Sequence, residues 1–280
     1  MNSIRHQQMS GSREFPLRSK TIGFACSMVL LVLGFTAGCQ TQVEETPWVP
    51  PQLADQDVVP SDGREVIERM AEFMDSHEEL AAAAFVTFEA VQKSGQKLHF
   101  NLLQRVALRK PDKLYWKTLR DDATVDTAWF SDGSFTMLKA PDMVWGQVDG
   151  PVKVSEMVEF LAEEYEVDVP FRDMLAGTAA DLWLSDEVSS VIYVGEAWVE
   201  GSWTDHVAIR KPGVDIEFWV RKGPEPFLNQ IVLVFTEDEG QPQYTARFRK
   251  WATTIPDPTV FDVSIPERSE RVEVVPVSER

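Results

Sequence analysis

Residues 96–116 read QKLHFNLLQRVALRKPDKLYW, and this stretch decides the fold. Apolar and polar side chains alternate along its first part, which is the two-residue period of a β-strand with one buried face. Pro111 lacks a backbone N–H and Asp112 favours turns, so we expect the chain to reverse at residues 110–113. Two neighbouring strands then share one apolar face, which needs an apolar cover. Its members are Leu98, Phe100, Leu102, Val106, Leu108, Leu114 and Trp116.

Short strands and turns continue downstream of Trp116. Alternation and turn residues predict strands at residues 125–131, 135–139 and 143–148. The period then becomes helical, which predicts one helix at 154–164 and a second at 171–183, a helical insertion at about 153–184. Further strands are expected at 189–198, 203–210, 215–220, 228–235 and 244–252. Residues 261–265 are a candidate closing edge segment, and we expect the tail after Pro266 to be poorly ordered.

Upstream, an amphipathic helix is predicted from Ser61 to about His77. Its apolar residues, Val66, Ile67, Met70, Phe73 and Met74, fall on one face at helical spacing. Residues 81–92 then form the first strand.

The first 38 residues have the features of an export signal. A basic leader precedes an apolar run that is too short to span a bilayer comfortably, and the run ends in Ala37-Gly38-Cys39. Small residues directly before a cysteine are typical of a bacterial lipoprotein, which predicts that Cys39 carries the lipid. An ordinary secretory peptide with an incidental cysteine is the alternative. Gln40, in place of Asp, favours the outer membrane over the inner membrane as the destination.

Residues 39–60 are predicted to be the acylated cysteine and a proline-rich tether, since they contain four prolines among polar residues. A tail without a spacing role fits the composition equally well. Residues 61–275 are predicted to form one domain. The chain has two cysteines, Cys26 in the leader and Cys39, so we expect no disulfide in this domain.

Three segments together carry a family resemblance: RKPDKLYW at 109–116, WFSDGSFTML at 129–138 and TVFDVSIPERSERVEVV at 259–275. In this order they resemble the periplasmic lipoprotein carriers LolA and LolB and, more closely, an uncharacterised family of predicted periplasmic proteins within that superfamily. The resemblance covers about residues 62–275. It implies an α+β fold, an open antiparallel β-barrel (a LolA-like half-barrel) with helices covering the concave apolar face. It also implies binding of acyl chains without catalysis.

The implied lipid-binding cavity would be lined from the strands and from the helical insertion. For the tryptophans, filling a core is the alternative to lining a cavity. The candidate residues are Phe100, Leu102, Val106, Leu108, Leu114, Trp116, Trp145, Met157, Leu161 and Met174.

Lys110 is the candidate lid latch. In the soluble carrier that the chain resembles, the residue before the corresponding proline is an arginine that helps to hold the lid shut. Lysine offers a point charge in place of a planar fork and cannot reproduce bidentate hydrogen bonding. A passive binder or receptor is therefore as consistent with this sequence as a shuttle.

Charge and motifs exclude several other classes. The formal net charge is −18, which argues against nucleic acid as a partner and against docking on an anionic membrane by charge alone. The histidines after the leader, His77, His99 and His206, have no metal-ligand spacing. No nucleophile elbow, P-loop or dinucleotide fingerprint occurs. We predict no catalytic residue, no metal site and no cofactor.

The sequence therefore predicts a monomeric lipoprotein of the periplasm or outer membrane. It would bind lipid, or the acyl moiety of lipoproteins, non-covalently in a hydrophobic cavity, and its N-terminal lipid would hold it to the membrane. The alternative is a cell-envelope protein-interaction or sensory module with a solid-packed barrel. A hydrolase of envelope lipids is a third class, which would require two carboxylates to meet as acid and base.

Overall fold

The computed structural model describes residues 60–279 except 141, 168 and 176–178. This part of the chain folds into one sheet of twelve strands in the order β12-β6-β5-β4-β3-β2-β1-β11-β10-β9-β8-β7. The strands are β1 (Glu79–Val91), β2 (Lys97–Arg109), β3 (Lys113–Arg120), β4 (Val125–Ser131), β5 (Ser134–Lys139), β6 (Val144–Asp149), β7 (Ser190–Val199), β8 (Ser202–Lys211), β9 (Val214–Arg221), β10 (Leu228–Val234), β11 (Gln243–Ala252) and β12 (Glu270–Arg271). The helices are α2 (Pro60–Asp75), α3 (Val154–Tyr165), α4 (Arg172–Leu175) and α5 (Ala179–Trp183), with short 3-10 turns η1 (Pro258–Phe261) and η2 (Val277–Glu279).

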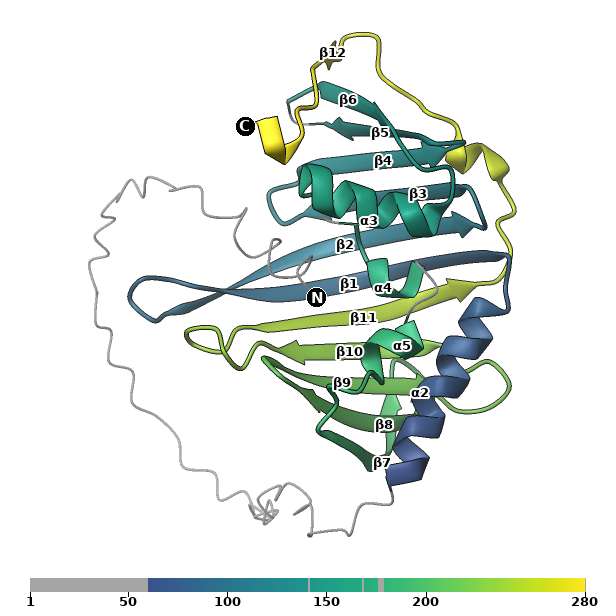
Figure 1. The fold of residues 1–280 in the computed structure, drawn as a ribbon, viewed down its shortest axis with the longest axis vertical. Helices are drawn as coiled ribbons and strands as arrows, with labels where there is room; N and C mark the ends of the chain where they lie inside the picture. The colour runs from purple at the N-terminus through teal and green to yellow at the C-terminus, as the bar shows by residue number, and fades with distance from the viewer. Residues whose placement is uncertain (1–59, 141, 168, 176–178, 280) are drawn as a thin grey trace, which may run out of the picture. The chain divides into compact units, whose positions relative to one another are not determined.

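Two antiparallel meanders, β1 to β6 and β7 to β11, make up the sheet except for β12, which pairs parallel with β6. The pairing of β1 with β11 joins the two meanders (Figure 1). Strands β1 to β6 extend from this seam in one direction and strands β11 to β7 in the other. Since β6 and β7 therefore lie far apart, the chain between them has to cross the sheet, and it does so as α3, α4 and α5 on one face. Helix α2 packs against α5 and against β7, β8 and β9. The predicted fold class, an open antiparallel β-structure with helices over its apolar face, is confirmed.

Strands β2 and β3 pair as the sequence predicts, with the reversal between Arg109 and Lys113. In this register Val106 lies opposite Trp116, and Leu108 lies opposite Leu114. All four side chains are buried in the main core, which also contains Met157 of α3. These four residues therefore share one core with the helical insertion, whereas Leu98, also predicted on the apolar face, is 37% exposed near the hairpin tip.

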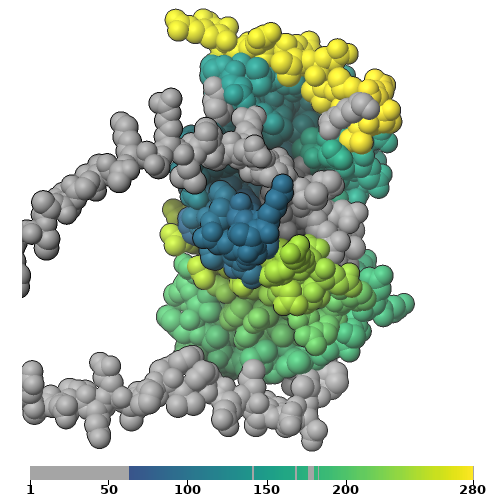
Figure 2. All heavy atoms as spheres, turned by 90° about the vertical axis from the view of Figure 1, so that its left-hand side faces the viewer, coloured from purple at the N-terminus to yellow at the C-terminus, as the bar shows by residue number. Residues whose placement is uncertain are grey.

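The tip of the β1–β2 hairpin lies beside the turn between β10 and β11. Figure 2 shows this end of the sheet, with the hairpin tip in blue next to the yellow-green turn. The Lys97 ammonium donates a hydrogen bond to the Gln241 carbonyl oxygen at 3.1 Å. Within the hairpin, the rings of Phe88 and Phe100 stack with centroids 5.5 Å apart. Phe100 is therefore partly buried and packs against the main core, to which Phe88 belongs.

The C-terminal segment departs from our expectation. After β11, the backbone N–H of Ile255 donates to the Glu79 carboxylate at 2.7 Å. This bond, with the Arg109 guanidinium, lowers the pKa of Glu79. The buried Phe261 belongs to η1, which packs on β3 and β4. The closing edge is therefore formed by β12 and not by residues 261–265.

The expectation of a poorly ordered tail after Pro266 is also wrong. Glu270 N–H donates to the Met143 carbonyl at 2.8 Å, and Val272 N–H donates to the Trp145 carbonyl at 2.9 Å. An edge strand such as β6 offers a row of unpaired backbone groups, and the tail satisfies some of them. Our prediction considered the tail alone, whereas β6 supplies its partner.

The helical insertion differs from the prediction in its second half. Residues 171–183, predicted as one helix, contain the two short helices α4 and α5, with residues 176–178 outside the described part of the chain. The predicted signal peptide at residues 1–38, the lipidation site Cys39 and the tether up to residue 59 also lie outside the described residues.

Candidate binding site

An apolar cavity of about 380 Å³ lies at the β6 end of the sheet. Its walls come from β5 and β6, from the end of α3 with the turn that follows it, and from the C-terminal segment. The apolar lining residues are Phe135, Met137, Val144, Trp145, Val148, Leu161, Val167, Val272, Val274 and Val275, and Tyr165 also contributes. Polar lining comes from Lys139, Gln147 and Glu273.

Strand periodicity explains which residues of β5 reach the cavity. Phe135, Met137 and Lys139 alternate along β5 and therefore lie on one face of the sheet. Ring stacking on Trp116 of β3, with centroids 5.4 Å apart, supports Phe135 from the core side. The cavity is thus an extension of the main core towards the sheet edge.

Gly146 of β6 allows the C-terminal segment to close one wall. A Cβ atom at this position would overlap with the Val274 side chain and would also contact Val272. Because glycine leaves this space free, Val274 can lie directly over the strand. The valines of the tail form a wall here that local sequence patterns did not indicate.

The structure places two of our ten predicted cavity residues, Trp145 and Leu161, in this cavity. Seven others are buried in the main core: Leu102, Val106, Leu108, Leu114, Trp116, Met157 and Met174. The tenth, Phe100, is partly buried beside Phe88. Whether these residues contact a ligand stays a prediction. The sequence reasoning missed Phe135 and Met137, although their alternation in the strand predicted at 135–139 was a usable signal.

Much of the helix-covered face is filled by aromatic side chains. Phe171, before α4, contacts Phe248 of β11 with centroids 4.8 Å apart, and Trp183 of α5 contacts Phe218 of β9 at 4.9 Å. Both contacts join the helical insertion to the meander formed by strands β7 to β11. The insertion is therefore packed against the sheet along its path, and the described cavity lies beside this packing.

Lys110, the predicted latch, contacts the C-terminal end of helix α2. Its ammonium donates to the Asp75 carbonyl at the end of α2, at 3.0 Å, and lies 3.6 Å from the Asp75 carboxylate. A cation at a helix C-terminus is favourable because the free carbonyls there carry partial negative charge. The next residue reaches the insertion through its backbone, since the Pro111 carbonyl accepts from Val154 N–H at 2.7 Å, at the start of α3. A latch role for Lys110 stays a prediction.

Gln104 interrupts the apolar face of β2. Its side chain is buried at 1% exposure, and neither its amide nitrogen nor its amide oxygen has a hydrogen-bond partner among the described residues. An unpaired buried polar group of this kind costs about 1–3 kcal/mol. The buried face of β2 therefore contains a polar side chain whose hydrogen-bonding groups are unsatisfied among the described residues.

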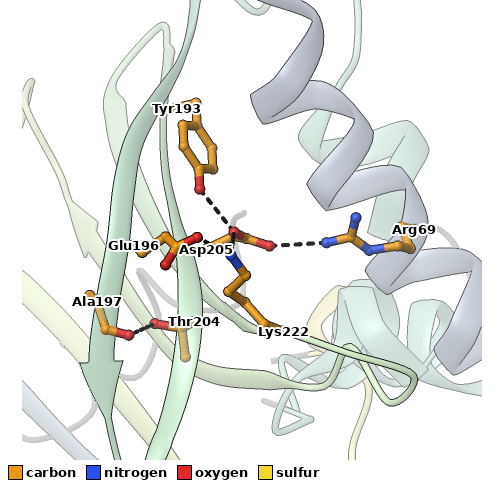
Figure 3. Close-up of polar contacts among 7 residues, drawn as sticks. All are labelled: Arg69, Tyr193, Glu196, Ala197, Thr204, Asp205 and Lys222. Carbon is orange, nitrogen blue, oxygen red and sulfur yellow. Dashed lines mark hydrogen bonds and ion pairs between the residues drawn. The ribbon is translucent and has the colours of Figure 1, made fainter.

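A polar cluster fixes α2 to the sheet (Figure 3). The Asp205 carboxylate of β8 accepts from the Arg69 guanidinium of α2 at 3.1 Å and from the Tyr193 hydroxyl of β7 at 2.9 Å. Lys222 lies 3.8 Å from the same carboxylate and forms an ion pair with Glu196. These groups satisfy one another, which is the pattern of a structural contact.

The described residues contain no group of three or more His, Cys, Asp or Glu side chains that could hold a metal ion. His99 pairs with Glu89, and His206 pairs with Glu217 and stacks on Trp219, so these two histidines have separate partners. Within the same part of the chain, no helix has the length and apolar character needed to span a membrane.

Comparison with known proteins gives a family. The model of the family described as "Predicted periplasmic protein (DUF2092)" matches residues 63–275. No curated protein matches the chain.

Several solved structures are similar at low identity. An uncharacterized conserved protein from Thermus thermophilus has a TM-score of 0.44 and 11% identity, with 75% of this chain and 98% of that chain covered. LprF from Mycobacterium bovis has a TM-score of 0.43 and 11% identity, with the same shares covered. MucB of Pseudomonas aeruginosa, in its complex with MucA, has a TM-score of 0.40 and 13% identity, with 72% of this chain and 61% of that chain covered. At TM-scores below 0.5, these likenesses support no conclusion about function.

Proposed function

Because this chain belongs to the DUF2092 family of predicted periplasmic proteins, we propose that it is an exported lipoprotein that binds acyl chains. The ligand is a lipid or the acyl moiety of a lipoprotein, held non-covalently. The protein acts as a carrier or receptor without catalysis. Its N-terminal lipid on Cys39 holds it to a membrane, with the outer membrane favoured by Gln40.

The observation that carries this proposal is the apolar cavity beside α3. Its volume of about 380 Å³ lies within the range of small-molecule sites, about 300–1,000 Å³. Acyl chains fit such a lining because each buried CH₂ contributes roughly 0.8 kcal/mol and needs no directional partner. Met137 in the wall has a flexible side chain that adapts to ligands of different shape.

A second candidate function rests on the filled part of the helix-covered face. The largest fully buried side chains include Trp116, Phe130, Phe218 and Phe248, all on strands. This packing favours a cell-envelope interaction or sensory module, in which the domain is a rigid support and its outer surface binds a protein.

Saturable acyl binding distinguishes the two functions. We expect the full chain carrying Cys39→Ser, which removes its own acyl group, to bind a fluorescent fatty-acyl probe saturably. Met137→Trp should fill the cavity and shift the preference to shorter chains, with a loss of about 0.8 kcal/mol for each CH₂ excluded. Titrations with acyl chains of increasing length measure this shift. A general loss of folding would not produce a length-dependent pattern, and circular dichroism checks the fold.

The acyl-binding proposal is refuted by a well-folded protein that takes up no probe and shows no co-purifying lipid in native mass spectrometry. Saturable binding with the same chain-length preference in the wild type and in Met137→Trp would place the acyl chain elsewhere in the protein.

The anchor is tested separately. Because Cys39 follows Ala37-Gly38 after an apolar run, the wild-type chain should be found in the membrane fraction, and Cys39→Ser should be soluble or unprocessed. Cys26→Ser, a change within the leader, is the matched control and should leave fractionation unchanged. Mass spectrometry of the mature N-terminal peptide checks for the acyl group. An unmodified N-terminal peptide from a wild-type protein free in the periplasm would contradict this prediction.

A further inference from the structure

We propose that the cavity selects acyl ligands with an anionic head group and that Lys139 binds this head group. The inference rests on the proposed acyl binding and names its ligand class, an apolar chain that ends in a carboxylate or a phosphate. Lys139 is the only cationic residue among those that line the described cavity.

Lys139 is placed where a head group would lie. It is the last residue of β5, two positions after the half-buried Met137 and four after the buried Phe135, and it shares their face of the sheet. The lining of β5 therefore changes along the strand from an aromatic ring to a thioether and then to an exposed ammonium. An amphiphile with its chain against Phe135 and Met137 would have its head near Lys139.

The nearest acidic residue in the sheet register already has a partner. Asp126 of β4 lies opposite Lys139, but its carboxylate is bound by the Arg120 guanidinium at 2.6 Å. Lys139 has no carboxylate within 4 Å among the described residues. Its positive charge is thus available to a ligand, in a chain with a formal net charge of −18.

Glu273 is the acidic residue of the lining and works against an anionic ligand. It lies between Val272 and Val274, which both approach Gly146. In an extended chain the residue between two such neighbours points away from them, and Glu273 is exposed. Its carboxylate therefore has access to water, which weakens its repulsion of a bound anion.

Because the chain as a whole is negatively charged, a cation at the site has a large effect on the affinity for an anionic ligand. Long-range repulsion between the chain and the ligand is screened by salt over about 8–10 Å at moderate ionic strength, whereas a direct ammonium–anion contact acts at hydrogen-bond distance. A carboxylate or phosphate head should therefore bind more tightly than a hydroxyl head on the same chain.

The test compares dodecanoate, dodecyl phosphate and dodecanol as competitors of the fluorescent acyl probe on the Cys39→Ser full chain. We expect the wild-type site to prefer at least one of the two anions to dodecanol. Lys139→Met should weaken the preferred anion about five- to tenfold and leave dodecanol unchanged, since methionine keeps the apolar stem. Glu273→Gln should tighten the anion. Lys117→Met, on the opposite face of the sheet beside Trp116, is the matched control and should change nothing.

The anion with the higher affinity identifies the ligand class. Tighter binding of dodecanoate indicates a fatty acid, tighter binding of dodecyl phosphate indicates a phospholipid, and either result supports the proposal. Equal affinity for all three competitors, or an equal loss of all three in Lys139→Met, would overturn it while leaving acyl binding intact. If the fluorescent probe does not bind in the first place, the proposed function itself fails, and this inference fails with it.

Discussion

Trp116→Ala is expected to lower the free energy of unfolding by about 3–5 kcal/mol. The Trp116 side chain is 2% exposed, and its ring stacks on Phe135. Truncation removes this apolar area from the core and leaves a cavity, because neighbouring strands can move in only partly. Denaturant unfolding followed by circular dichroism measures the loss.

Trp198→Ala is the matched control for this change. Trp198 is 61% exposed on β7, and its ring contacts that of the exposed Trp203, with centroids 5.5 Å apart. Its removal should cost about 1 kcal/mol or less. Similar losses for the two variants would show that Trp116 does not belong to a packed core. Since Trp116 supports Phe135, we also expect Trp116→Ala to weaken acyl binding in the cavity.

Asp205→Ala should lower the free energy of unfolding by about 2–3 kcal/mol. Its side chain is only 10% exposed and accepts hydrogen bonds from Arg69 and Tyr193 (Figure 3). Without the carboxylate, the Tyr193 hydroxyl and the Arg69 guanidinium each lose a hydrogen bond, and the one from Arg69 joins α2 to the sheet. The predicted loss is below that of a fully buried ion pair because Arg69 and Lys222 can still reach water.

The exposed pair Arg210–Asp215 provides a control of the same chemistry. Its guanidinium and carboxylate form two hydrogen bonds of 2.7 Å, but the Arg210 side chain is 68% exposed. Asp215→Ala should therefore cost about 1 kcal/mol or less. Chemical denaturation of both variants at low and high salt compares them. If Asp205→Ala were no more destabilising than Asp215→Ala, the cluster would not hold α2 to the sheet.

Local signals in the sequence were sufficient for most of the secondary structure. The alternation in residues 96–108, the turn at Pro111 and the helical spacing of Val66, Met70 and Phe73 are all set by neighbours a few residues apart. The elements β2, β3, α2 and α3 lie where these patterns predicted them. The resemblance to a family supplied the fold class, which the patterns alone did not.

The candidate site was predicted less well, because burial looks the same in a core and in a cavity wall. Leu108 and Trp116 were correctly assigned to an apolar face, but alternation cannot tell whether such a face meets another side chain or a ligand. The buried Gln104 shows the same limit, since its place in the apolar period was visible and its lack of a partner was not.

The sequence by itself determined the strands, the turns, the amphipathic helices and the apolar character of one sheet face, since each depends on short-range periodicity. Only the tertiary structure decided which strands far apart in the sequence pair, such as β1 with β11 and β6 with β12, and where a cavity remains. Glu79 meets Ile255 across 176 positions of the chain, and Gly146 leaves room for Val274. Contacts of this kind depend on backbone groups and side-chain volumes that come together only after folding. For this reason the local sequence did not indicate that the C-terminal segment pairs with β6 and forms one wall of the cavity.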